Sequence, residues 1–137
     1  MSNINRVSVI LGDVRYYLDE FRDISSEDDY DLEERKTYYA VSMILFTILN
    51  SVIELGEELI TEKNLVVPGS YREIFRLLGK ADIVPKDLAK DLSSLVYYRN
   101  RLSHQYSGFN EDDLESVISK LAVIEEFMSC AEKELIS

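Results

Sequence analysis

The residues best suited to chemistry lie between positions 97 and 106, in the sequence Tyr-Tyr-Arg-Asn-Arg-Leu-Ser-His-Gln-Tyr. This stretch contains the single histidine of the chain, His104, which follows Arg99 by five residues. An imidazole can take or give a proton near neutral pH, and a guanidinium is a permanent cation whose planar fork matches phosphate oxygens. Together they indicate chemistry on a phosphate ester.

The element that carries these residues must satisfy a geometric condition. Arg99 occupies a position where the spacing of Leu92 and Leu95 predicts another hydrophobic residue, so it is either paired with a buried carboxylate or kept for function. On one helix, at about 100° per residue, Arg99 and His104 lie about 140° apart. Either the helix ends near Ser103, so that His104 is turned toward the same phosphate as Arg99, or two subunits combine their motifs.

Arg99, His104 and Tyr106 match the pattern R-x4-H-x-Y. With this pattern the sequence resembles HEPN-domain proteins, specifically the HepT-like toxins encoded beside minimal nucleotidyltransferase antitoxins. The polar residue after the arginine, Asn100, also fits the family. The resemblance covers essentially the whole chain and includes two further segments, 53–60 and 70–75.

The resemblance implies a homodimer in which both motifs line a cleft at the two-fold axis. In such a cleft RNA is cleaved without a metal or other cofactor: the ribose 2′-hydroxyl loses its proton to His104 and attacks phosphorus, while Arg99 stabilises the phosphate charge. Asn100 would hold the imidazole or a phosphate oxygen, and Arg101 and Tyr106 would contact the substrate. A partner nucleotidyltransferase would adenylylate Tyr106 and so neutralise this endoribonuclease toxin.

Other functions remain open at this point. The main alternative is a non-catalytic HEPN subunit that binds nucleotide or substrate for a two-component nucleotidyltransferase. A purely helical interaction protein would leave Arg99 unexplained, and His104 would then be a surface or helix-end histidine. A metal site within one subunit is not expected, because the motif region has one histidine and no carboxylate between Leu92 and Asn110.

Length and composition favour one helical domain over residues 1–137, since hydrophobic residues make up 46% of the chain and it has two prolines and five glycines. Cys130 is the single cysteine, so no intramolecular disulfide is expected, in keeping with the cytoplasm. The N-terminus lacks a basic start followed by an apolar run, and the apolar stretch 40–49 is too short to span a bilayer. We therefore expect a cytoplasmic protein without membrane contact.

The formal net charge of −11 argues against general nucleic-acid binding. The charge is uneven, because residues 63–104 carry eight basic and four acidic side chains and the flanking regions are acidic. A local basic patch would admit one RNA strand, whereas the alternative is that these cations are solvated helix faces. The candidate patch comprises Arg72, Arg76, Lys80, Lys86, Lys90, Arg99 and Arg101.

Apolar residues spaced by three and four predict an all-α, antiparallel HEPN-type bundle of four main helices plus one short helix. The first helix covers 3–23 and the second 30–62, with Asp29 or Asp31 as its N-cap. The second helix has two apolar stripes, so it is either the centre of the bundle or also faces a partner subunit.

The remaining boundaries follow from capping and breaking residues. Ser70 with Glu73 starts a short helix that Gly79 ends, and Pro85 opens the helix that bears the motif. Asn110 with Asp113 caps one last helix that continues to the C-terminal region.

Overall fold

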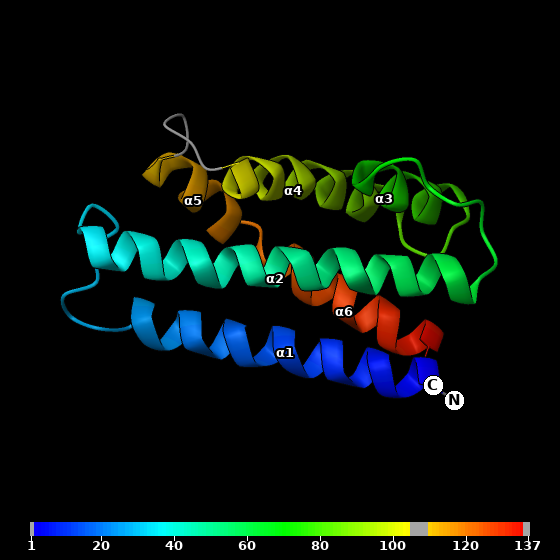
Figure 1. The fold of residues 1–137 in the computed structure, drawn as a ribbon, viewed down its shortest axis with the longest axis horizontal. Coiled ribbons are helices and arrows are strands. Elements are labelled where there is room, and N and C mark those ends of the chain that lie inside the picture. The colour runs from blue at the N-terminus through cyan, green and yellow to red at the C-terminus, as the bar shows by residue number, and fades with distance from the viewer. Residues whose placement is uncertain (1, 105–109, 136–137) are drawn as a thin grey trace.

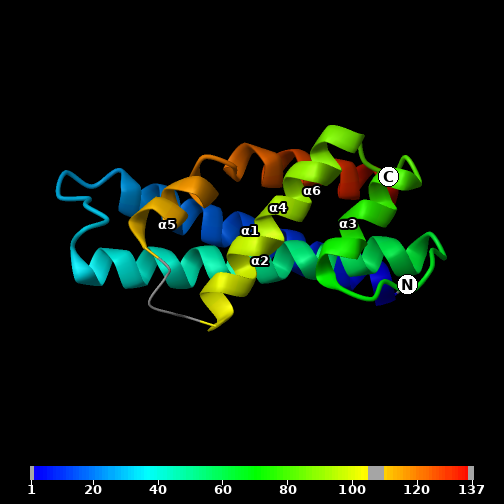
Figure 2. The same cartoon turned by 90° about the horizontal axis from the view of Figure 1, so that it is seen from above.

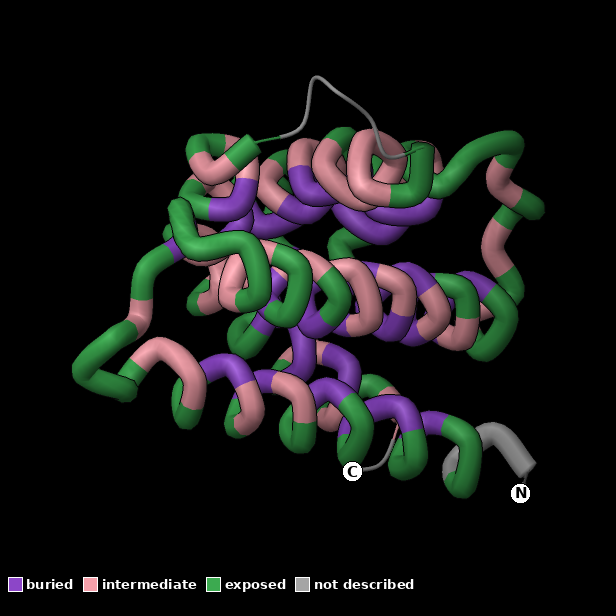
Figure 3. The backbone as a smooth tube through the Cα atoms, turned by 60° about the vertical axis from the view of Figure 1, so that its left-hand side comes forward, coloured by how far each residue is buried: buried purple, intermediate pink, exposed green. Residues whose placement is uncertain are grey.

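Helix α2 (Arg35–Glu62) is the centre of the molecule. In the computed structural model, which describes residues 2–104 and 110–135, it touches each of the other helices of those residues. Its apolar side chains are buried along most of its length, including Val41, Leu45 and Leu55. Figure 3 shows this burial as purple bands along the facing sides of the helices. The prediction that α2 forms the centre of the bundle is confirmed.

Four long helices run in alternating directions, as Figures 1 and 2 show. The first two lie side by side, the fourth crosses α2 obliquely, and the last runs back along the first, so both ends of the chain lie at one end of the bundle. The helices besides α2 are α1 (Ser2–Ser25), α3 (Tyr71–Lys80), α4 (Lys86–His104), α5 (Glu111–Ile118) and α6 (Leu121–Leu135).

The all-α antiparallel bundle is confirmed, but the predicted last helix is divided. The Lys120 N–H donates to the Val117 carbonyl at 2.9 Å, and the Val123 N–H donates to the Lys120 carbonyl at 3.0 Å. This turn separates the short helix α5 from the longer helix α6, so the described residues contain two helices where one was predicted. The apolar spacing alone did not reveal the break, because it continues on both sides of the turn.

Two of the predicted caps are confirmed and one is wrong. Asn110 and Asp113 form a reciprocal capping box at the start of α5. The Ser70 hydroxyl accepts the Glu73 N–H at 3.2 Å at the start of α3. Helix α2, however, begins five residues later than predicted, and its N-cap is Glu34, whose carboxylate accepts the Thr37 N–H at 2.8 Å.

Gly79 has a different role from the one predicted. It does not end α3, which continues through Lys80. A Cβ atom at Gly79 would lie 2.7 Å from the Cβ of Ala89, closer than real side chains approach. The glycine therefore lets the C-terminal end of α3 pack directly against α4.

Length and apolar composition alone would allow α2 to cross a membrane, with a mean hydropathy of 1.6 over its most apolar stretch. However, 56% of that stretch is buried inside the bundle. Its apolar character is therefore explained by its central position.

Candidate active site

Arg99 is held by two amide oxygens. Its Nε–H donates to Oδ1 of Asn50 on α2 at 2.8 Å, and Nη1 donates to Oδ1 of its neighbour Asn100 at 3.2 Å. The contact with Asn50 joins residues that are 49 positions apart in the sequence, and it forms where α4 crosses α2. Both partners are neutral, so they orient the guanidinium without cancelling its charge.

Two aromatic rings complete the surroundings of this guanidinium. Its Cζ lies 5.6 Å from the ring centroid of Phe46 and 5.0 Å from that of Tyr71. Phe46 lies one helical turn before Asn50, and Tyr71 is the first residue of α3. The Ser70 cap starts α3 at Tyr71, which places this ring beside Arg99 for a cation–π contact.

No carboxylate among the described residues forms an ion pair with Arg99. The stretch 105–109, which the structure does not describe, contains no aspartate or glutamate. The explanation that Arg99 pairs with a buried carboxylate is therefore wrong. A half-buried guanidinium with neutral partners keeps its positive charge for an anion.

His104 lies on a different side of the same helix. Helix α4 stays helical through His104, its last residue, and the side chain is exposed. The two motif residues therefore lie about 140° apart around the axis and about 7.5 Å apart along it. One chain does not bring them to the same side of α4. Tyr106 falls outside the described residues.

The side of α4 that bears His104 also bears Tyr97 and Arg101, at seven and three residues before it. Here the arginine has an acidic partner, because Nη2 of Arg101 lies 3.3 Å from Oδ2 of Asp113 on α5. Its Cζ lies 5.5 Å from the centroid of the Tyr97 ring. The two motif-region arginines thus differ in charge compensation.

A family model described as Ribonuclease HepT-like matches residues 14–131 of the sequence. The chain belongs to the HepT-like ribonuclease family. A comparison with curated proteins gave no significant match.

Solved structures share the fold of this HepT-like chain. One is a tri-AMPylated HEPN toxin of Shewanella oneidensis in complex with an MNT antitoxin (TM-score 0.84, 19% identity, covering 93% of this chain and 97% of that one). A toxin-antitoxin structure with AMP-PNP is similar (TM-score 0.85, 18% identity, 93% and 98% covered). The cytosolic protein YutE of Bacillus subtilis, of unknown function, is a third (TM-score 0.81, 20% identity, 94% and 87% covered). At these identities the likeness establishes the fold.

The predicted basic patch of the HepT-like chain is partly compensated. Its members lie on or beside α3 and α4, but several are engaged by acids, which distinguishes them from Arg99. The ion pairs are Arg76 with Glu73 at 3.0 Å, Lys86 with Asp82 at 3.4 Å and Arg101 with Asp113 at 3.3 Å. No group of three His, Cys, Asp or Glu side chains in the described ranges is arranged to hold a metal ion.

Acidic residues of α5 surround the Arg101 side. Burial, followed by the charges of Glu111 and Asp113, raises the pKa of Tyr38 above its ordinary value. Burial and the charge of Glu115 likewise raise the pKa of Tyr30. Negative charge from α5 therefore lies beside the start of α2 as well as beside Arg101.

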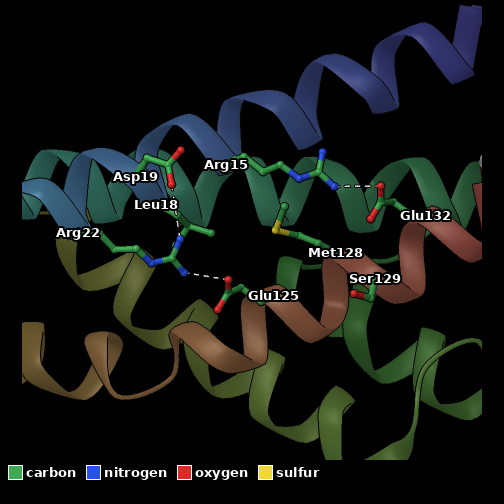
Figure 4. Close-up of a pocket in the computed structure, with 8 residues that line it drawn as sticks. All are labelled: Arg15, Leu18, Asp19, Arg22, Glu125, Met128, Ser129 and Glu132. Carbon is green, nitrogen blue, oxygen red and sulfur yellow. Dashed lines mark hydrogen bonds and ion pairs between the residues drawn. The ribbon is translucent and has the colours of Figure 1, made fainter.

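A separate pocket of about 350 Å³ lies between α1 and α6, and none of its lining residues belongs to the motif (Figure 4). Its two arginines are both matched by acids, since Arg15 lies 2.9 Å from Glu132 and Arg22 lies 2.8 Å from Glu125. These pairs cross from α1 to α6 and tie the helices together. The pocket therefore lacks the uncompensated cation that distinguishes the Arg99 site.

The sequence did not identify Asn50, Phe46 or Tyr71 as site residues. The available signal was the amide of Asn50 within the second apolar stripe of α2, one turn after Phe46. Tyr71 gave no signal, because its contact with Arg99 depends on how α3 packs on the bundle.

Proposed function

We propose that two copies of this HepT-like chain form a metal-independent endoribonuclease site, in which Arg99 of one copy and His104 of the other act on one phosphodiester. The observation that carries this proposal is the placement of the two residues on different sides of one continuous helix. A second copy related by a two-fold axis supplies the missing residue to each Arg99.

The surface beside Arg99 suits a second copy. Tyr39 and Met43 on α2 are 64% and 65% exposed, and they continue along the same stripe to Phe46 and Asn50 at the Arg99 site. We refer to Tyr39, Met43 and Phe46 as the α2 patch. Covering this apolar patch with its own counterpart would bring the C-terminal ends of the two α4 helices toward each other.

The chemistry then follows from the residue types. One His104 removes the proton of a ribose 2′-hydroxyl, and the resulting oxygen attacks the adjacent phosphorus. The bond from phosphorus to the 5′-oxygen breaks, and that oxygen receives the proton that the same His104 removed. Arg99, oriented by Asn50 and Asn100, stabilises the negative charge that develops on the non-bridging oxygens.

The test is cleavage of single-stranded RNA by the purified chain in EDTA. We expect products with a 2′,3′-cyclic phosphate and a 5′-hydroxyl, identified by mass spectrometry, and no cleavage at a position that carries a single 2′-deoxyribose. Cleavage that requires added magnesium or zinc, or that proceeds at the deoxyribose, would contradict the proposed reaction. A chain that leaves RNA intact but tightens nucleotide binding by a partner enzyme would favour the non-catalytic subunit.

The same site explains how a minimal nucleotidyltransferase would act as the antitoxin. The Shewanella oneidensis neighbour is described as tri-AMPylated and in complex with an MNT antitoxin. In this chain the acceptor would be the hydroxyl of Tyr106, two residues after His104. An attached AMP phosphate would pair with Arg99 or Arg101 and exclude the RNA backbone, in the same cytoplasmic setting that the sequence predicts.

Intact mass spectrometry measures this modification. With ATP, magnesium and a cognate nucleotidyltransferase, the chain should gain one or more AMP units and lose RNA cleavage. Tyr106→Phe should abolish the gain and keep the fold, and it should retain part of the cleavage because proton transfer is assigned to His104. If AMP is found on Tyr97 or Tyr98 instead, the inhibitory modification occurs at a different side chain from the one proposed.

A further inference from the structure

The side of α4 that bears His104 holds an exposed aromatic ring in a fixed position. Tyr97 is 51% exposed, although it stands in a helix that packs on the core. The Arg101 guanidinium lies over its ring at 5.5 Å, and the ring of Tyr98 meets it edge-on at 5.1 Å and 83°. The next tyrosine, Tyr98, is instead half-buried and packs against the core.

The position of Arg101 is itself fixed. Asp113 lies 3.3 Å from Nη2 of Arg101 and also accepts the Asn110 N–H at 3.0 Å within the capping box of α5. Asp113 therefore holds Arg101, and Arg101 covers one side of the Tyr97 ring. A ring held in this way loses little conformational freedom when a second planar group stacks on it.

The ring is also close to the proposed chemistry. Tyr97 and His104 are separated by seven residues on one helix, so they share a side, with Arg101 between them. The distance along the helix axis is about 10 Å. This length is close to the distance, in a single-stranded RNA, between a phosphodiester and the base of a nucleotide one or two positions along the strand.

On the basis of the proposed endoribonuclease function, we infer that Tyr97 is a nucleobase-stacking residue. A base of the single-stranded RNA, beside the cleaved phosphate, stacks on the side of the ring that Arg101 does not cover. Every base has a π-face, so this contact grips RNA without selecting a sequence. It also explains how a chain with a formal net charge of −11 would hold RNA, since stacking replaces part of the electrostatic attraction.

The test is fluorescence anisotropy with a short single-stranded RNA that is 2′-O-methylated throughout, so that the intact protein binds but does not cleave it. Tyr97→Ala should weaken binding roughly tenfold or more, whereas Tyr97→Phe should bind nearly as well as the unchanged protein. The matched control is Tyr16→Ala, because Tyr16 is 58% exposed and meets Tyr17 edge-on at 5.0 Å on α1, and its loss should not change binding.

A second measurement separates stacking from a structural role. An abasic sugar moved along the oligonucleotide should weaken binding to the unchanged protein at one position, and this penalty should disappear in Tyr97→Ala. Equal abasic profiles in the two proteins, or a loss of the dimer in Tyr97→Ala by light scattering, would overturn the inference. If the unchanged protein cleaves RNA while Tyr97→Ala cleaves and binds equally well, the stacking role fails and the endoribonuclease stands. If the unchanged protein binds no RNA, both fail.

Discussion

The two sides of α4 near its C-terminal end hold their arginines in opposite ways. Arg99 donates to the amide oxygens of Asn50 and Asn100 and lies against two aromatic rings, with no carboxylate partner among the described residues. Arg101, two residues later, is paired with Asp113. The fold therefore keeps one charge available and compensates the other. Because His104 lies on the second side, the available cation and the proposed proton carrier belong to different surfaces of one chain.

This difference suggests separate tasks for the two sides. A cation whose partners are neutral costs more to bury than one in an ion pair, so a fold that keeps such a cation half-buried is expected to use it. The arginines between α1 and α6 show the opposite arrangement, because Arg15 and Arg22 both contact glutamates that join two helices. Those arginines are compensated at the surface, whereas the Arg99 arrangement suits anion binding.

The largest expected effect is the loss of either motif residue. Arg99→Ala and His104→Ala should each reduce RNA cleavage about a thousandfold, because one removes the phosphate charge partner and the other the proton carrier. Circular dichroism and light scattering should show unchanged helix content and oligomeric state. Arg22→Ala, which removes an exposed ion-paired arginine on α1, is the control and should leave cleavage unchanged. Appreciable cleavage by Arg99→Ala would contradict the proposal that the Arg99 side of α4 supplies the cation that acts on the phosphate.

A carboxylate placed beside Arg99 should pair with it, as Asp113 pairs with Arg101. Asn50→Asp keeps an oxygen acceptor for Nε of Arg99 but adds a carboxylate at about 2.8 Å. We expect cleavage to fall about ten- to hundredfold, because the new carboxylate cancels the positive charge that would stabilise the phosphate. The melting temperature should stay equal or rise, because the hydrogen bond to Arg99 is kept and an ion pair is added. Asn50→Ala should instead lower both activity and stability. Full activity in Asn50→Asp would show that the neutral acceptor is unimportant.

The reverse exchange on the other side should have a smaller effect. Asp113→Asn keeps an oxygen that accepts from the Asn110 N–H and from Nη2 of Arg101, so Arg101 and the Tyr97 ring stay in position, but it removes the negative charge beside Arg101. RNA binding at low salt should tighten about two- to fivefold, and the free energy of unfolding should fall by less than about 1 kcal/mol. Weaker RNA binding in this variant would contradict the prediction and show that the Asp113 charge itself is needed to position Arg101 beside Tyr97.

The smallest effect concerns acid stability at the helix starts. Hydrogen bonds from Gly69 and Arg76 hold the pKa of Glu73 below its ordinary value, and hydrogen bonds from Thr37 and Lys36 do the same for Glu34. A lowered folded-state pKa gives stability that is present above the unfolded value, about 4.3, and is lost as pH falls through the folded value. The melting temperature should therefore be flat from pH 7 to about 5 and fall below that. Glu73→Gln should reduce the fall, and an unchanged profile would contradict this assignment.

The sequence predicted the elements of the bundle well, because their signals are local. The capping pair Asn110 and Asp113 and the cap at Ser70 are set within one helical turn, and the fold confirms them. The N-cap of α2 was wrong, because several acidic residues precede that helix and local rules do not rank them. The actual cap, Glu34, is distinguished by its contact with the Thr37 N–H.

The candidate site was predictable only in part. Arg99 stood out because it interrupts an apolar seam, but its anchors lie on other helices, and no local pattern links Asn50 or Tyr71 to it. The role of Gly79 was missed for the same reason, since it depends on the approach of Ala89 from α4. Contacts between helices require the packing, which the spacing of one helix does not specify.

The most direct test of the account is complementation between two inactive variants. Arg99→Ala and His104→Ala chains are unfolded and refolded together, so that mixed dimers form, and RNA cleavage is measured. If Arg99 and His104 of different copies share a site, each mixed dimer has one intact pair, and statistical mixing should restore about a quarter of the unchanged activity. Each variant refolded alone should stay inactive. A mixture that remains inactive, although mass spectrometry shows mixed dimers, would contradict the shared site and place both residues at the phosphate from one chain.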